Sequence, residues 1–330
     1  MVNPLLSIKD LKVSFRSNDR AMVRAVDGVS LDVHPGETLG IVGESGCGKT
    51  TVARAIIGQV QPDEGTIYLD GQPLGRQRTI TQRRAVQMVF QDPYSSLNPR
   101  MTAQQTLREL LRVHQLVPSS ETNRRCQELL EMVGLPSRVL HNYPSQFSGG
   151  QRQRLAIARA LAVEPRAIVA DEPVSALDVS VQATILQLFA ELKASLGLTL
   201  ILISHDLAVV RHLCDRIAVM YLGRIAERGS REVIFDDPRH PYTRALLTAA
   251  PRIRRYEAPE DLGLRGELPG GVDIPAGCRF HPRCPIAESI CERDDPPLLG
   301  LDGDPGHLSA CHFRAARVAN GSSQVKRLEL

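Results

Sequence analysis

A glycine-rich stretch near the N-terminus has the residue types and spacing needed to hold a polyphosphate. The apolar run TLGIV is followed by GESGCGKT, which fills every fixed position of the pattern G-x-x-x-x-G-K-S/T. Glycines let successive backbone amides turn towards a phosphate, Lys49 reaches the β- and γ-phosphate oxygens, and the Thr50 hydroxyl can bind Mg²⁺. The alternative is a chance glycine-rich turn, which the strand before it and the helix after it disfavour. The residues expected to hold the phosphates of a nucleotide here are Gly43, Glu44, Ser45, Gly46, Cys47, Gly48, Lys49, Thr50 and Thr51.

A second stretch, RAIVADE, places two carboxylates at the end of an apolar run. A buried strand that ends in Asp171 puts one carboxylate beside the metal of the phosphate site, so Asp171 is expected to bind Mg²⁺ directly or through water. Glu172 is expected to polarise the attacking water. The residues DEP also resemble the start of a helix, so a mere helix cap is the alternative. The complete phosphate loop favours the metal site.

A third stretch, FSGGQRQR, has two glycines after a serine at the expected start of a helix. Exposed amides and the positive end of the helix dipole make such a start a second anion site. This stretch comes about a hundred residues after the phosphate loop. It therefore need not serve the same nucleotide.

The three stretches together resemble the ATP-binding subunits of ABC transporters, whose signature stretch is LSGGQ. FQDP, SALD and SHD match further motifs of that family, and the resemblance covers about residues 5–250 with the motifs in the expected order. It implies an α/β fold: an ABC-type P-loop ATPase core with a parallel sheet, an antiparallel β subdomain and a helical insert over about 92–160. It also implies that ATP is held between two subunits that face each other head to tail.

The resemblance implies a role for each matched residue. The expected catalytic residues are Glu172, His205 in SHD and Gln91 in FQDP. The expected Mg²⁺ ligands are Thr50, Gln91 and Asp171. Phe15 lies where the family carries an aromatic residue that stacks on adenine. The residues expected to face the partner's nucleotide are Ser148, Gly149, Gly150, Gln151 and Asp178. Taken singly, Gln91 could be a turn residue, His205 a structural histidine and Phe15 a core residue.

Other stretches resemble one subfamily, the importers of dipeptides and oligopeptides, which also includes importers of nickel, glutathione and other small solutes. These stretches are DPYSSLNPRMT, RHPYTRALL and a cysteine-bearing tail. The resemblance implies an ATP-hydrolysing subunit, peripheral on the cytoplasmic face of the inner membrane. Its expected partners are two transmembrane permease subunits, a second homologous ATPase subunit and, through the complex, an extracytoplasmic solute-binding protein. The expected domains are an ATPase over 1–235 and a C-terminal region over 236–330.

Four cysteines of the tail, Cys278, Cys284, Cys291 and Cys311, are separated by five, six and nineteen residues. Disulfides are disfavoured because the chain is expected in the reducing cytosol. Four thiolates suit zinc or an iron–sulfur cluster, although zinc sites usually use closer cysteine pairs. The spacing resembles the set that binds a 4Fe-4S cluster in some peptide-importer ATPases, so a structural cluster is expected. Four reduced cysteines that pack a small tail are the alternative, and the nearby histidines His281, His307 and His312 are alternative ligands.

The local patterns predict the elements that position these residues. Short apolar runs with turns over 5–42 predict strands, and apolar residues three and four apart over 101–140 predict helices. From about residue 151, helices alternate with the buried strands RAIVAD and TLILIS, which implies a parallel sheet. Two closing strands in IAVMYLGRIAERGS and a helix PYTRALLTA follow.

Composition narrows the function classes. The 330 residues carry a net charge of +3, aromatics make up 4% and tryptophan is absent, so no nucleic-acid partner is expected. No secretory leader is visible, and the longest apolar runs are far below the roughly 18 residues of a membrane helix. The rival classes are a soluble ABC ATPase that acts on DNA or ribosomes and the ATPase of an exporter. The short helical patterns and the peptide-importer tail disfavour both.

Overall fold

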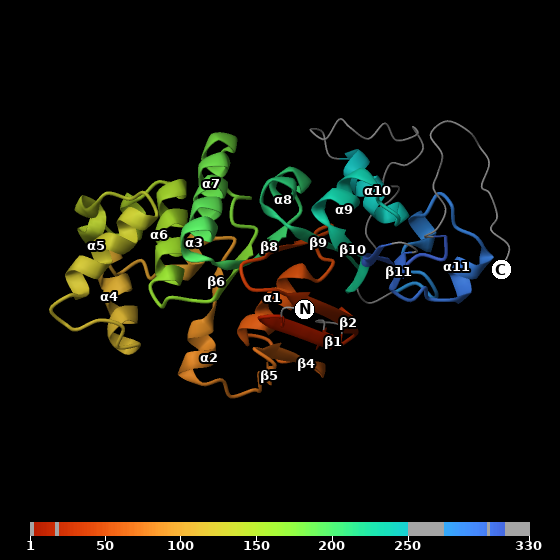
Figure 1. The fold of residues 1–330 in the computed structure, drawn as a ribbon, viewed down its shortest axis with the longest axis horizontal. Coiled ribbons are helices and arrows are strands. Elements are labelled where there is room, and N and C mark those ends of the chain that lie inside the picture. Colours follow the sequence, from red (N-terminus) through yellow and green to blue (C-terminus); the bar gives the residue numbers. More distant parts are fainter. Residues whose placement is uncertain (1–2, 17–19, 250–273, 302–303, 314–330) are drawn as a thin grey trace.

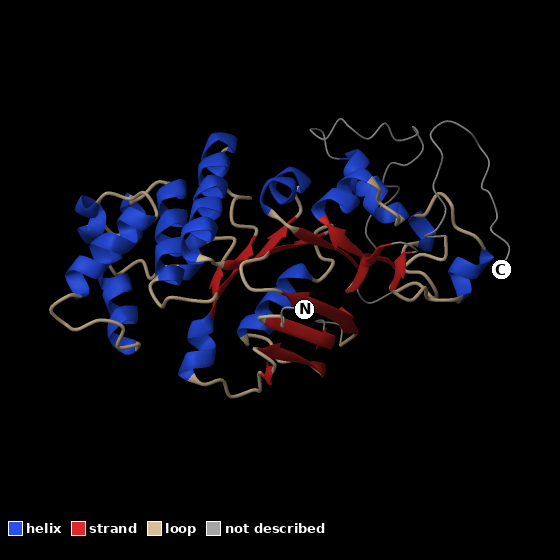
Figure 2. Ribbon diagram, viewed as in Figure 1, coloured by secondary structure: helices blue, strands red, loops and turns tan. Residues whose placement is uncertain are grey.

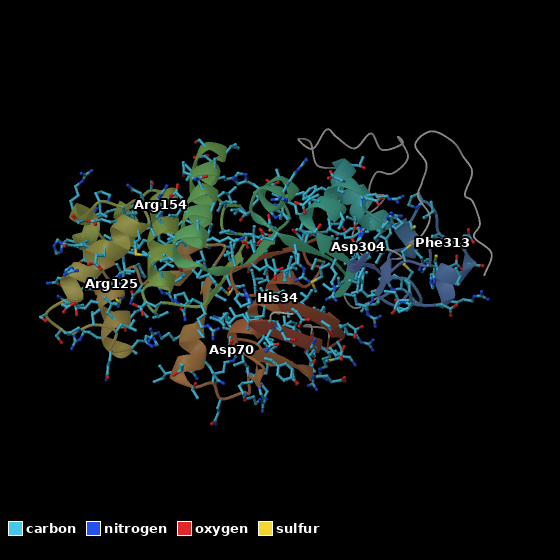
Figure 3. The ribbon with its side chains drawn as sticks, in the orientation of Figure 1. His34, Asp70, Arg125, Arg154, Asp304 and Phe313 are labelled. Atoms are coloured by element: carbon cyan, nitrogen blue, oxygen red, sulfur yellow. The ribbon has the colours of Figure 1, made fainter. Side chains whose placement is uncertain are left out.

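The computed structural model describes residues 3–16, 20–249, 274–301 and 304–313. The described part is elongated, with a helical lobe at one end, the C-terminal region at the other and two sheets between them (Figure 1). Side chains labelled in Figure 3 mark the two ends: Arg125 and Arg154 lie in the helical lobe, whereas Asp304 and Phe313 lie in the C-terminal region.

The larger sheet has eight strands in the order β11-β12-β10-β9-β3-β8-β7-β6. Its parallel strands are β3 (Thr38–Val42), β6 (Val86–Val89), β7 (Ala167–Asp171), β8 (Thr199–Ser204) and β9 (Arg216–Tyr221). Its antiparallel edge is formed by β10 (Arg224–Ser230), β11 (Leu299–Leu301) and β12 (Asp304–Ser309). The predicted parallel sheet, with β9 and β10 as closing strands, is confirmed.

Strand β8 shows why this sheet is the centre of the core. All six residues of TLILIS are buried, as expected for a parallel strand that is covered on both faces. Leu200 and Leu202 belong to the apolar cluster on one face, and Ile201 and Ile203 to the cluster on the other. Successive side chains of a strand point to opposite faces, so one strand supplies both cores.

The smaller sheet has the order β2-β1-β4-β5 and is antiparallel. Its strands are β1 (Leu6–Arg16), β2 (Met22–Val33), β4 (Glu64–Leu69) and β5 (Gln72–Pro73). Helix α1 (Lys49–Ile57) contacts β2 of this sheet and β6, β7 and β8 of the larger one. The smaller sheet lies below the larger one, with α1 between them (Figures 1 and 2).

The helical lobe is built on amphipathic helices. In α4 (Ala103–Val113) the buried residues Ala103, Thr106, Leu107 and Leu111 recur at helical spacing. Thr102 and Gln105 cap its start reciprocally, which fixes the first turn of the helix at Ala103. The other helices up to β7 are α2 (Ile80–Ala85), α3 (Pro93–Ser96), α5 (Thr122–Met132), η1 (Ser137–His141), η2 (Pro144–Gln146) and α6 (Gly149–Leu161).

The C-terminal region adds strands that the sequence did not predict. Strand β12 pairs with β10, and β11 pairs with β12, so this region extends the core sheet. The remaining helices are α7 (Val179–Leu196), α8 (Leu207–Leu213), α9 (Arg231–Asp236), α10 (Pro241–Ala249), η3 (His281–Arg283) and α11 (Ser289–Arg293). Much of the predicted tail, 250–273 and 314–330, lies outside the described residues. Within the described ranges, no helix has the length and apolarity to cross a bilayer.

Candidate nucleotide site

The phosphate loop joins β3 to α1 at a place where the backbone passes very close to its neighbours. Gly43 has φ 154°, and a Cβ there would lie 2.2 Å from the Met220 carbonyl oxygen. Gly48 has φ 107°, and a Cβ there would lie 2.1 Å from the Ala25 carbonyl oxygen. Only glycine fits at these two positions, because any side chain would force the loop away from the strands that hold it.

Lys49 begins α1 and is the cation of the loop. Only 5% of Lys49 is exposed, and its Nζ donates to the carbonyl oxygens of Gly43, at 2.7 Å, and Glu44, at 2.8 Å. The loop thus holds the ammonium group next to its own backbone. Burial raises the pKa of the neighbouring Cys47 thiol, so this cysteine is uncharged at neutral pH.

Asp171, at the end of β7, lies beside the start of α1. The Thr50 hydroxyl donates to Asp171 Oδ1 at 3.1 Å, and the aspartate is 4% exposed. Burial raises the pKa of Asp171, and the hydrogen bond from Thr50 opposes that shift. A hydroxyl and a carboxylate in contact are hard oxygen donors of the kind that Mg²⁺ prefers, so these residues fit the expected metal.

Glu172 is the next residue and meets two of the other predicted site residues. Gln91 Nε2 donates to Glu172 Oε2 at 3.0 Å, and His205 Nδ1 lies 2.9 Å from Glu172 Oε1. Glu172 has φ 45°, a left-handed conformation that costs a non-glycine residue free energy of order 1–3 kcal/mol. Strain of this kind clusters at functional sites, where the surrounding structure holds it in place. The carboxylate is therefore aimed by both its backbone and its partners.

A pocket of about 290 Å³ joins these segments. It is lined by Ala25, Ser45, Gly46, Gly48, Lys49, Thr50, Thr51, Gln91 and Glu172. The sequence did not identify Ala25, because an alanine side chain has no group that could react or bind a phosphate. Ala25 lines the pocket only because β2 runs past the phosphate loop. Phe15 is 42% exposed at the end of β1 and does not line this pocket. Its predicted contact with adenine stays a prediction.

The signature stretch lies outside this pocket. Ser148 caps α6: its hydroxyl accepts from the Gln151 backbone N–H at 3.3 Å, and the Gln151 side chain accepts from the Ser148 N–H at 2.9 Å. A Cβ on Gly150 would lie 2.5 Å from Val181 in the first turn of α7, the helix whose N-cap is Asp178. Ser148 and Asp178 are exposed. The predicted partner-facing residues therefore form one surface patch, and in the described residues that patch does not line the chain's own phosphate pocket.

The four cysteines of the C-terminal region line one small cavity of about 10 Å³. None of the four forms a disulfide in the described part of the chain, and burial raises the pKa of Cys284 to about 11 and of Cys311 to about 12. No group of three or more His, Cys, Asp or Glu side chains in the described ranges is arranged to hold a metal ion. The 4Fe-4S cluster and the zinc site both stay predictions.

The histidines that could have replaced a cysteine as ligand have other partners. His307 Nε2 lies 2.7 Å from Glu227 Oε1. His281 Nδ1 lies 2.9 Å from the Cys278 carbonyl oxygen, and His312 Nε2 lies 2.9 Å from the Asp294 carbonyl oxygen. His307 is not among the residues that line the cysteine cavity, whereas His281 and His312 line it together with the four thiols.

The fold and the phosphate site define the class of protein. A family model described as ABC transporter matches residues 26–175, and one described as oligopeptide/dipeptide transporter, C-terminal region, matches residues 226–291. In solved structures, the chain is similar to the dimeric ATP-binding cassette MJ0796 in a post-hydrolysis state bound to ADP and Pi, with a TM-score of 0.62 and 31% identity over 68% of this chain and 98% of that one. The chain is an ABC-type ATP hydrolase.

Curated relatives place it more narrowly. It is 48% identical to a probable peptide ABC transporter ATP-binding protein of Sinorhizobium fredii, over 90% of this chain and 85% of that protein. It is also 48% identical to the oligopeptide transport ATP-binding protein AppF of Bacillus subtilis, over 88% of this chain and 90% of that protein. The chain belongs to the family of ATP-binding subunits of oligopeptide/dipeptide-type ABC transporters.

Proposed function

We propose that this chain energises the import of dipeptides or oligopeptides. The observation that carries the proposal is the single pocket shared by Lys49, Thr50, Gln91 and Glu172, in a chain whose C-terminal region matches the oligopeptide/dipeptide transporters. The same machinery with nickel, glutathione or another small solute as cargo is the second candidate. Solute choice would belong to two transmembrane permease subunits and a solute-binding protein, with this chain peripheral on the cytoplasmic face of the inner membrane.

Each residue in or beside the pocket has its own part in the proposed chemistry. Mg²⁺, held by Thr50, Gln91 and Asp171, would supply charge stabilisation to the phosphates. Glu172 takes a proton from the attacking water at its carboxylate, and His205 and Gln91 keep that carboxylate aimed through their contacts with its two oxygens. Lys49 neutralises charge on the β- and γ-phosphates.

The second half of the site comes from a second ATPase subunit. The patch of Ser148, Gly149, Gly150, Gln151 and Asp178 is exposed or half-buried and lies outside the chain's own pocket, which supports a role on the partner's nucleotide. The amides at the start of α6 would then face a phosphate. ATP would join two subunits head to tail, and its hydrolysis would release them. The proposed division is an ATPase domain over 1–235, with its helical insert about 92–160, and a C-terminal region over 236–330.

Replacement of the loop lysine tests the proposal. Lys49→Ala removes the main cation of the pocket, so the reconstituted transporter should lose ATP-driven peptide uptake while the subunit still assembles on the permease. Uptake is measured with a labelled oligopeptide in proteoliposomes. Uptake near the wild-type rate would show that this loop does not power the transporter.

We also propose that the four cysteines hold a 4Fe-4S cluster as a structural clamp. Support comes from the four thiols, two buried and two half-buried, that line one cavity, and from a tail that is poor in apolar residues. Protein purified anaerobically should be brown, with about four irons per chain and broad absorbance near roughly 400 nm that is lost in Cys284→Ser. One tightly held zinc in colourless protein would make it a zinc site. Metal-free protein with a folded tail would leave four packing thiols.

A further inference from the structure

The segment between the first two tail cysteines, CRFHPRC, inserts three side chains into the body of the protein. Phe280 is 2% exposed and packs its ring against Tyr221, at 5.3 Å between centroids, and Tyr242, at 5.4 Å. Arg279 and Arg283 lie on either side of it and are also buried. The short helix η3 (His281–Arg283) turns the chain so that the two arginines reach different parts of the ATPase core.

Arg283 reaches the phosphate loop. Its guanidinium makes a bidentate contact with the Glu44 carboxylate, at 2.7 Å from Nη1 to Oε2 and 3.0 Å from Nη2 to Oε1. The Arg283 side chain is 6% exposed and that of Glu44 21%. The hydrogen bond to Glu44 raises the pKa of Arg283 above its usual range, so the guanidinium stays charged. Two parallel charged hydrogen bonds fix a carboxylate in direction as well as in distance.

Tyr242 holds the backbone of the same loop residue. The Glu44 N–H donates to the Tyr242 hydroxyl at 2.9 Å, and Tyr242 in α10 is completely buried. The Glu44 carbonyl accepts from Lys49 Nζ at 2.8 Å. All three polar groups of Glu44 therefore have a partner, and two of those partners come from the C-terminal region rather than from the ATPase motifs.

We propose that Tyr242 and Arg283 are positioning residues of the ATP site, through which the C-terminal region holds the phosphate loop in its nucleotide-binding shape. The inference rests on the assignment of Gly43–Thr51 as the ATP-binding loop. A loop that is already ordered pays less conformational entropy when it binds phosphate. Arg283 also neutralises the Glu44 carboxylate, which is a negative charge within the loop that is expected to bind the phosphates.

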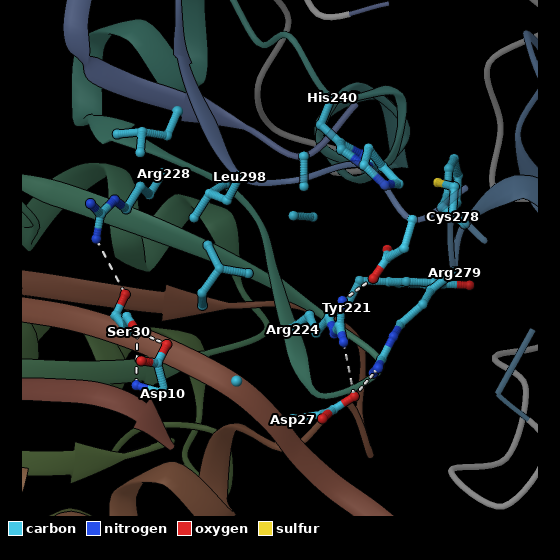
Figure 4. Close-up of a pocket in the computed structure, with 18 of the residues that line it drawn as sticks. Asp10, Asp27, Ser30, Tyr221, Arg224, Arg228, His240, Cys278, Arg279 and Leu298 are labelled. Atoms are coloured by element: carbon cyan, nitrogen blue, oxygen red, sulfur yellow. Dashed lines mark hydrogen bonds and ion pairs between the residues drawn. The ribbon is translucent and has the colours of Figure 1, made fainter. Parts of the chain in front are cut away.

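The C-terminal region has separate anchors, so loss of Arg283 does not by itself release it. Arg279 pairs with Asp27 on β2, which also accepts from Arg224 at 3.2 Å (Figure 4). Strand β12 pairs with β10 at the register Glu227 to Ser309. None of these contacts involves Glu44, which makes the contribution of Arg283 to nucleotide affinity separable from its contribution to stability.

Titration of the full-length chain with ADP measures the contribution of these two residues. Arg283→Met and Tyr242→Phe should each weaken ADP binding by about tenfold, because each removes one hydrogen-bonding partner of the loop. ATP hydrolysis at saturating ATP should stay within about twofold of wild type, because neither side chain lies among the pocket residues. Arg283→Lys, which keeps the charge but not the bidentate contact, should recover part of the affinity.

Matched variants separate positioning from folding. Arg239→Met removes a half-buried arginine of the C-terminal region, one that pairs with Asp237 in its own segment, and should leave ADP affinity unchanged. In a Glu44→Gln background, Arg283→Met should cost much less affinity than it does alone. Equal losses in Arg239→Met and Arg283→Met, or ADP affinity within about twofold of wild type in Arg283→Met, would overturn the proposal. If Arg283→Met does not fold, Tyr242→Phe and Arg283→Lys decide it in the same assay. Lys49→Ala that still bound ADP normally would instead contradict the loop assignment.

Discussion

His240, in the C-terminal region, is a residue whose protonation state is set by its burial against the core. The residue is 3% exposed, and its Nδ1 accepts the Tyr242 N–H at 3.1 Å. Its backbone N–H donates to the buried carboxylate of Glu227 at 3.0 Å. Burial lowers the pKa of His240 to about 4, although Glu227 acts in the opposite direction. The ring is therefore neutral in the folded protein, and its Nδ1 lone pair is used.

The depressed pKa predicts a loss of stability in mild acid. Below the ordinary histidine pKa of about 6.5 the unfolded chain binds a proton that the folded chain excludes, so stability falls as pH drops towards about 4. Between pH values of about 7.5 and 5, the free energy of unfolding should fall by about 2 kcal/mol because of this group. Urea unfolding at both pH values should show that extra loss in the wild type and not in His240→Gln. Equal losses in the two proteins would show that His240 is not the responsible group.

Residue-level prediction succeeds where chemistry forces a local pattern and fails where contacts are distant. The motifs around Lys49 and Glu172 each have a short signature, and the structure brings both to one pocket. The contact between Arg283 and Glu44 leaves no such signature, because the residues are 239 positions apart. From the sequence alone, an arginine in a polar, proline-rich stretch is expected to be exposed to solvent, and only the structure shows that Arg283 is buried.

Elements follow the same division. Helix α7 and strand β8 could be predicted from periodicity alone, since one has a long apolar stripe and the other a fully apolar run. Strands β11 and β12 could not, because DPGHLS contains a proline and a glycine, which are depleted in strands. Their pairing with β10 comes from tertiary structure, since β12 lies more than seventy residues further along the chain. The sequence therefore could not predict that the C-terminal region adds strands to the core sheet.

At the scale of the whole molecule, we propose that the chain supplies one half of an ATP site. One part of this half-site is formed by the phosphate loop, the carboxylates and the residues that orient them. The start of α6 carries exposed or half-buried residues that do not line the chain's own pocket. Tyr242 and Arg283 of the C-terminal region bind the phosphate loop at Glu44. In this account, the partner subunit supplies the remaining contacts to ATP, and the C-terminal region holds the phosphate loop in place.

The most direct test of this account is ATP turnover and assembly in the Glu172→Gln variant of the full-length chain. The amide keeps the shape of the carboxylate but cannot take a proton from water, so ATP binding should persist while turnover falls by about 10²-fold or more. The variant should accumulate as an ATP-bound dimer, with itself or with the second ATPase subunit. Addition of Ser148→Arg should abolish that dimer and leave ATP binding by the monomer intact. Turnover within about tenfold of wild type, or ATP-bound protein that stays monomeric with Ser148 unchanged, would contradict a site that is shared between two subunits and uses Glu172 as its base.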